Sequence, residues 1–315
     1  MEKKKLKFAF YWAASCGGCE IAVLDINERI LDVVANADIV FWPVAIDIKY
    51  KDVEAMPDKS IDVCFFNGAI RTEENEKLAK LLRKKAKVLV AFGSCACDGC
   101  VKGLANLWDK KTVFERAYFE TPSTKNPQSL TPKTSFKVKE GELELPEFYD
   151  TVKTLDQTVD VDYYLSGCPP PVPLIIQAVE AIFTGKLPPK GTVLMPTKSI
   201  CDECPREKKD RKLSEIKRIY EIDDDFKTCF WDQGVVCMGP ATRAGCGAQC
   251  PNVNIPCTGC DGPGPRVTDQ GAAAISALAS IATNPDVINQ VVDPIGTFYK
   301  YSLARSILRR KVMKK

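Results

Sequence analysis

The chain of 315 residues contains no histidine. This absence excludes nucleophilic catalysis with an imidazole base, zinc hydrolase centres built on histidine, and haem held by histidine. Neither G-x-x-x-x-G-K-[ST] nor G-x-G-x-x-G occurs, so no motif predicts nucleotide binding. The net charge is also small, because 44 basic and 41 acidic residues leave a value of +3. That balance argues against a protein that binds nucleic acid through phosphate contacts.

Long apolar runs are missing as well, and no segment approaches the length of a membrane span. The first residues, MEKKKLKFAFYWAASC, are too quickly interrupted for a secretory signal and carry no twin-arginine pair. We therefore expect a cytoplasmic protein. Cysteine, in contrast, is abundant, with 15 residues. In a reducing compartment, cysteines at motif spacings are ligands more often than disulfides.

The densest cysteine segment runs from residue 229 to residue 260, where glycines and prolines leave almost no aliphatic run. Metal-ligand bonds are the natural source of folding free energy for such a segment. Its last part reads C-x3-C-x6-C-x2-C through Cys246, Cys250, Cys257 and Cys260. Four thiolates on a tight loop suit one iron-sulfur cubane, although zinc accepts the same ligands and a disulfide network is a third alternative.

The first half of the chain alternates apolar strands with helices, which predicts an α/β fold with a doubly wound parallel sheet. The expected strands are 6–11, 39–44, 61–66, 87–92 and 161–165, and the expected helices are 20–34, 73–85 and 174–183. The pattern stops near 188–196. Residues 121–150 are expected to form a surface insertion with a short hairpin. Residues 205–225 are expected to form a solvated charged helix, and residues 298–315 are expected to form a basic amphipathic helix.

Cysteine loops follow three of these strands. Cys16 and Cys19 follow the first strand, Cys95 follows the strand at 87–92, and Cys168 follows the strand at 161–165. Ligands of such sheets sit beyond the carboxyl ends of the strands, so we expect these four thiolates on one edge. Cys97 and Cys100 share a loop with Cys95 and compete with it for one position. Cys64 lies inside a strand and is expected to be a buried, inert thiol.

Several motifs together resemble the small, electron-transferring subunit of nickel-iron hydrogenases. They are SCGGCE near the N-terminus, GSCACDGC around Cys95, SGCPPP at 166–171, CDEC at 201–204, and CMGPAT and PCTGC in the 229–260 segment. Within that family the chain is most similar to the cytoplasmic methyl-viologen-reducing (deazaflavin-non-reducing) hydrogenase of methanogenic archaea. The resemblance implies a flavodoxin-like domain over 1–190 and an irregular, cysteine-rich iron-sulfur domain over 191–315.

The resemblance also implies three [4Fe-4S] clusters with twelve ligands. By position, the proximal ligands are Cys16, Cys19, Cys95 and Cys168; the medial ligands are Cys246, Cys250, Cys257 and Cys260; the distal ligands are Cys201, Cys204, Cys229 and Cys237. Cys250 supplies a fourth medial ligand that many members of the family lack. Cys201 stands where many members have histidine.

The function that the resemblance implies is electron relay. Hydrogen is oxidised at a nickel-iron site in a separate large subunit, and electrons pass to a small iron-sulfur acceptor subunit that feeds heterodisulfide reductase. Two alternatives stay open. A quinone-module subunit of a respiratory complex shares the flavodoxin-like domain, but it typically has adjacent cysteines where this chain has Cys16 and Cys19, and it lacks the second domain. A structural zinc protein would use the same thiolates.

Overall fold

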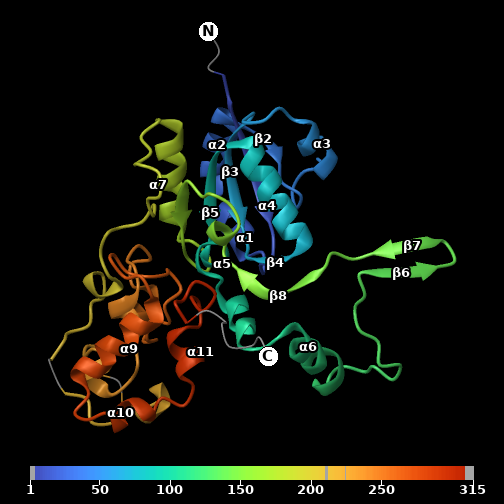
Figure 1. The fold of residues 1–315 in the computed structure, drawn as a ribbon. Helices are drawn as coiled ribbons and strands as arrows, with labels where there is room; N and C mark the ends of the chain where they lie inside the picture. Colours follow the sequence, from blue (N-terminus) through green and yellow to red (C-terminus); the bar gives the residue numbers. More distant parts are fainter. Residues whose placement is uncertain (1–3, 210–211, 224, 309–315) are drawn as a thin grey trace.

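The computed structural model describes residues 4–209, 212–223 and 225–308, and a five-stranded parallel sheet forms its first half (Figure 1). The strand order is β2-β1-β3-β5-β9. The strands are β1 (Leu6–Trp12), β2 (Ala37–Phe41), β3 (Ile61–Asn67), β5 (Ala86–Phe92) and β9 (Tyr163–Leu165). This is the flavodoxin-like order, with the chain reversing direction across the sheet between β1 and β3. The predicted α/β fold is confirmed.

Helices cover both faces of the sheet because successive strand residues point to opposite sides. Phe8 and Phe10 of β1 pack with α1 (Gly18–Leu24), α2 (Ile30–Asn36) and α7 (Val172–Phe183). Ala9 and Tyr11 of the same strand pack on the other face with α3 (Tyr50–Ala55), α4 (Glu73–Lys85) and α5 (Ser94–Asp98). Both faces are therefore buried, as a parallel sheet requires.

The carboxyl ends of four strands lie level with one another. Trp12 of β1 pairs with Asn67 of β3, Asn67 pairs with Phe92 of β5, and Phe92 pairs with Leu165 of β9. The loops that leave these strands consequently start from one edge of the sheet.

The second half of the chain has its own apolar core, which includes Phe230, Met238, Leu278 and Phe298. Its helices are α8 (Gln249–Asn252), α9 (Gln270–Ile281), α10 (Asp286–Asn289) and α11 (Pro294–Phe298), and short 3-10 turns lie at 200–202, 219–221, 231–233 and 239–241. Among the described residues after β9, the backbone forms isolated bridges but no strand. This region matches the irregular, cysteine-rich part predicted from the sequence. The boundary near residue 190 stays a prediction.

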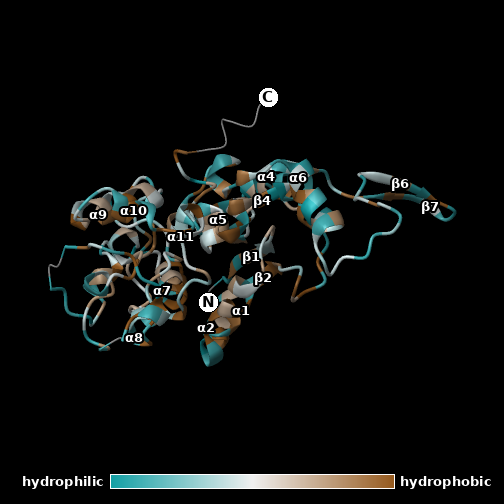
Figure 2. Ribbon diagram, turned by 90° about the horizontal axis from the view of Figure 1, so that it is seen from below, coloured by the Kyte–Doolittle hydropathy of each residue, from teal (hydrophilic) through white to brown (hydrophobic). Residues whose placement is uncertain are grey.

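The expected insertion projects from the body of the molecule (Figures 1 and 2). The insertion, 121–150, contains the hairpin β6 (Ser135–Val138) and β7 (Gly141–Glu144), and it follows α6 (Lys110–Glu115) and a π-helical turn (Arg116–Glu120). The chain returns through β8 (Phe148–Lys153), which pairs antiparallel with β4 (Ile70–Thr72). The predicted hairpin is therefore present.

Three expected helices differ from the structure. The segment 20–34 divides into α1 and α2, since Asn27 between them adopts a left-handed φ of 53°. The charged run 205–225 forms no α-helix in its described residues; Leu213 is buried in the second core, and Ile216 and Ile222 pack against it from an irregular backbone. In the tail, α11 ends at Phe298 and turns follow to Leu308; residues 309–315 lie outside the described part. Within the described residues, no helix combines the length and apolarity needed to cross a membrane.

Candidate metal centres

The first group of cysteines lies at the carboxyl edge of the sheet. Cys19 begins the buried face of α1, Cys95 lies in α5 after β5, and Cys168 follows β9. Burial, and then the negative charges of the thiolates of Cys95, Cys168 and Cys16, raise the pKa of Cys19. The four predicted proximal residues therefore lie together. Gly93 is required here, because a side chain at that position would collide with the Cys19 sulfur.

Cys95 has polar neighbours that favour a thiolate. Its pKa is lowered mainly by a hydrogen bond from the Cys100 thiol and by the positive charge of Lys102, against the opposing effect of burial. The Lys102 Nζ lies 3.7 Å and the Ser15 Oγ 3.9 Å from the Cys95 sulfur. A thiolate is the form of cysteine that binds metal, so this environment suits a ligand.

The three remaining cysteines of the first domain lie in different surroundings. The Cys97 thiol points into the core and donates a hydrogen bond to the Ala91 carbonyl at 3.3 Å. Cys64 is fully buried in β3, as predicted from the sequence. Cys100 instead lies beside the proximal group, with its sulfur 3.6 Å from that of Cys168. Of the two competitors of Cys95, the structure brings only Cys100 to this group.

A second group lines one cavity of about 370 Å³ in the cysteine-rich region. Cys201, Cys204, Cys229 and Cys237, the four predicted distal residues, all face this cavity, together with Phe230, Trp231 and Lys208. Burial raises the pKa of Cys237 to about 12, and burial likewise raises the pKa of Cys201 while the charge of Lys208 opposes it. Four thiols around one partly apolar cavity are the arrangement expected of a buried metal centre.

The third group contains three of the four predicted medial cysteines. Burial raises the pKa of Cys260, and Cys257 and Cys246 are among its charged neighbours. Cys250 lies half-buried in α8, which precedes Cys257 and Cys260 in the chain. The structure thus places Cys260 beside Cys246 and Cys257.

Asp261 is a member of this group that we did not predict from the sequence. Its side chain is 2% exposed, and burial raises the pKa of its carboxyl to about 6. The Cys246 and Cys260 thiols donate hydrogen bonds to it, with the Cys260 sulfur 3.8 Å from Oδ1. Oδ2 has no hydrogen-bond partner among the described residues. In the sequence, Asp261 is marked only by its position directly after the C-x2-C motif, and that position alone is weak evidence for a residue at a metal centre.

Among the described residues, no group of three or more histidine, cysteine, aspartate or glutamate side chains converges closely enough to hold one metal ion. Zinc and iron-sulfur clusters take the same thiolate ligands, and metal analysis distinguishes them.

Comparisons with known proteins agree over nearly the whole chain. Residues 16–182 match the family described as NADH ubiquinone oxidoreductase, 20 Kd subunit. The F420-non-reducing hydrogenase iron-sulfur subunit of Archaeoglobus profundus is 44% identical over 98% of this chain and 99% of its own. The corresponding subunit of the Methanothermobacter thermautotrophicus F420-non-reducing hydrogenase is 37% identical over 99% of this chain and 98% of its own. The chain belongs to this family of F420-non-reducing hydrogenase subunits. It belongs equally to the broader 20 Kd subunit family.

This hydrogenase subunit shares its fold with a more distant enzyme. The [NiFeSe]-hydrogenase of Dm. baculatum aligns with a TM-score of 0.51 and 15% identity, covering 83% of this chain and 95% of the other. The suspected resemblance to nickel-iron hydrogenase small subunits is confirmed, and the chain is a subunit of an oxidoreductase. The broader family match ends at residue 182, whereas the hydrogenase relatives also align with the cysteine-rich region.

Proposed function

We propose that this hydrogenase subunit relays electrons through three [4Fe-4S] clusters. Electrons from hydrogen oxidation at a nickel-iron site in the large subunit would enter at Cys16, Cys19, Cys95 and Cys168. They would pass the group at Cys246, Cys250, Cys257 and Cys260 and leave through Cys201, Cys204, Cys229 and Cys237. When bound, each cluster supplies one-electron chemistry; the chain's own residues fix the spacing and surroundings.

The observation that carries this proposal is that the three cysteine groups follow one another in space. The hydroxyl of Ser94, which directly precedes Cys95 of the first group, donates to the carbonyl oxygen of Cys260 in the second. The Cys257 backbone N–H in the second group donates to the Cys237 sulfur of the third at 3.3 Å. Because electron tunnelling falls steeply with distance, a row of adjacent centres is what a relay requires.

Apolar side chains beside the first group support the large subunit as the partner there. Trp12, Ile21 and Leu24 are 39%, 60% and 57% exposed, and all lie within a few residues of Cys16 and Cys19. Such residues on a monomer surface are typical of an interface with another protein. At the opposite end, beyond the third group, we propose a small iron-sulfur acceptor subunit that feeds heterodisulfide reductase. Cysteine ligation without disulfides fits a cytoplasmic complex.

Metal analysis tests the relay directly. We expect about twelve irons and about twelve acid-labile sulfides on this chain in the anaerobically purified complex, since three cubanes hold four of each. Nickel should stay with the large subunit when the two chains are separated. Zinc without sulfide on this chain would contradict the relay and leave a structural metal protein.

The fourth medial ligand can be tested by spectroscopy. We expect no three-iron signal in fresh, anaerobic protein, because Cys250 completes the medial set. Cys250→Ala should lose about one iron of about twelve and show a three-iron signal by Mössbauer and EPR spectroscopy. Asp261→Ala is the matched comparison, since Asp261 lies against Cys246 and Cys260. A three-iron signal in Asp261→Ala but not in Cys250→Ala would contradict the assignment and make the carboxylate the ligand.

A further inference from the structure

Ser94 lies where the loops of two proposed clusters meet. It directly precedes Cys95, begins α5 and is 1% exposed. Its backbone N–H donates to the Gly167 carbonyl at 2.8 Å, which ties the loop of Cys95 to the loop of Cys168. Its side chain faces the carbonyl of Cys260, from the cysteine-rich region. Three ligand loops therefore converge on one buried residue.

The Ser94 hydroxyl has the hydrogen-bonding capacity to join all three loops. A serine hydroxyl offers one donor and two acceptor positions. The Gly167 N–H donates to the Ser94 Oγ at 3.1 Å, and the hydroxyl donates to the Cys260 carbonyl oxygen. One side chain thus carries a hydrogen-bonded connection from the proximal loops to a medial loop.

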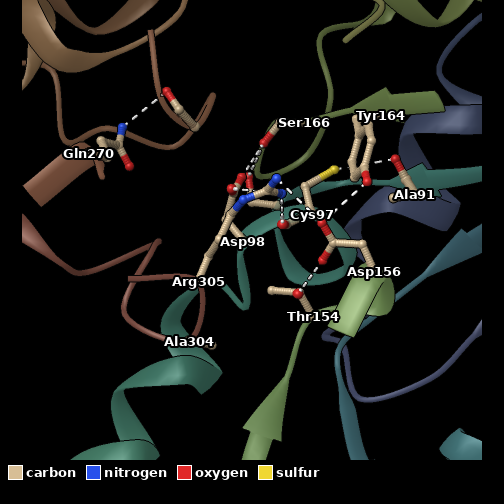
Figure 3. Close-up of polar contacts among 12 residues, drawn as sticks. Ala91, Cys97, Asp98, Thr154, Asp156, Tyr164, Ser166, Gln270, Ala304 and Arg305 are labelled. Atoms are coloured by element: carbon tan, nitrogen blue, oxygen red, sulfur yellow. Dashed lines mark hydrogen bonds and ion pairs between the residues drawn. The ribbon is translucent and has the colours of Figure 1, made fainter. Parts of the chain in front are cut away.

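A buried polar network lies beside this hydroxyl, and Figure 3 shows its members Ser166, Asp98 and Arg305. The Ser166 Oγ lies 3.2 Å from the Ser94 Oγ and donates to Asp98 Oδ2 at 3.0 Å. Arg305 approaches Asp98 at 3.9 Å and donates to the Cys97 carbonyl at 2.8 Å. Gly262 packs directly on this network, since a Cβ there would lie 2.7 Å from Asp98 Oδ2.

The C-terminal segment holds the two halves of the chain together around this point. The Cys100 N–H donates to the Tyr301 carbonyl at 2.9 Å, and the Gln157 side chain donates to the Ala304 carbonyl at 3.0 Å. Ser306 donates to Asp269 Oδ2 at 2.6 Å on the cysteine-rich side. At this junction the Ser94 hydroxyl adds a direct contact between the medial loop and the proximal loops.

We propose that Ser94 is a positioning residue for electron transfer between the proximal and medial clusters. This inference rests on the proposed relay. Its hydroxyl fixes the loop of Cys260 against the loops of Cys95 and Cys168 and provides a direct hydrogen-bonded link between them. Removing the hydroxyl leaves the Cys260 carbonyl and the Gly167 N–H without this buried partner, which loosens the contact.

The test is the time that electrons take to cross this contact. The oxidised complex of this chain with its large subunit is mixed with hydrogen, frozen at intervals and examined by EPR. In Ser94→Ala, we expect the delay between reduction of the proximal and of the medial cluster to lengthen about tenfold. The proximal cluster itself should be reduced at an unchanged rate. A general loss of stability would slow both steps, so a change in the second step alone identifies a positioning role. Ser94→Thr retains the hydroxyl and should restore most of the rate.

Thr154→Val is the matched control. The Thr154 hydroxyl is also buried, but it donates to Asp156 Oδ1 at 2.5 Å within the first domain. We expect the delay in this variant to equal that of the unsubstituted complex.

Two outcomes separate this inference from the proposal on which it rests. If the complex without substitutions contains no iron and no sulfide, both the relay and this inference are wrong. A full complement of clusters in Ser94→Ala with an unchanged delay overturns the inference alone. If Ser94→Ala does not retain its clusters, Ser166→Ala removes the neighbouring hydroxyl instead, and an unchanged delay in that variant also overturns the inference.

Discussion

Replacing Cys19 with alanine is expected to remove about four of about twelve irons from this subunit and to abolish hydrogen-dependent reduction of any acceptor. Cys19 is almost completely buried beneath Cys16, Cys95 and Cys168, so no solvent thiol or water easily takes its place. Loss of the first cluster interrupts the relay at its entry. The measurements are iron and sulfide analysis and dye reduction under hydrogen, made on the complex with the large subunit.

Cys97→Ala is the matched control for this loss. Cys97 is equally buried and belongs to α5 like Cys95, but its thiol donates to the Ala91 carbonyl within the core. We expect full iron content and activity, with a loss of about 1 kcal/mol in the free energy of unfolding. Loss of iron in Cys97→Ala, or its retention in Cys19→Ala, would contradict the proposed ligand set.

Cys100→Ala addresses the remaining ambiguity in the same loop. The Cys100 sulfur lies close enough to Cys168 and Cys95 to exchange hydrogen bonds with both. Full iron in this variant, together with loss of iron in Cys95→Ala, is the result expected if Cys95 is the ligand. The reverse pattern would assign the ligand to Cys100.

The proximal group was predictable because its geometry follows from strands. Parallel strands end at a common edge, so the positions of Cys16, Cys95 and Cys168 after three strands were enough to bring them together. The order of the strands and the two buried faces follow from the same apolar pattern. Which thiol of the 95–100 loop faces the group was not predictable. Its direction depends on the short helix α5, which turns Cys97 toward the core and leaves Cys100 at the edge.

The contacts between the two halves of the chain were beyond sequence reasoning. Asp98, Ser166 and Arg305 have no shared motif or period, and each is polar in a way that is ordinary for an exposed residue. Only the fold makes them one buried network. The described part of the tail, 299–308, was wrongly predicted as a helix for the same reason: Ser306 and Arg305 contact Asp269 and Asp98, and these contacts accompany turns instead of regular helical structure. Local periodicity does not register such tertiary contacts.

Replacing Cys201 with histidine is expected to raise the reduction potential of the distal cluster, on the order of 100 mV. A neutral imidazole in place of a thiolate removes one negative charge and a strong electron donor, so the reduced state becomes easier to form. Cys201 faces the same cavity as Cys204, Cys229 and Cys237, which places the substitution at the centre itself. Redox titration followed by EPR measures the potential of each cluster in the same sample.

Asp202→Asn separates the effect of the ligand from that of charge alone. Asp202 is the next residue and also carries one negative charge, but it is exposed and accepts hydrogen bonds from Ser199, which asparagine can preserve. Solvent and salt screen an exposed charge, so its removal should shift the distal potential far less. Equal shifts in the two variants would mean that Cys201 acts through its charge and is not a ligand. A shift confined to Cys201→His, with the other two potentials unchanged, is the signature of ligation at the distal site.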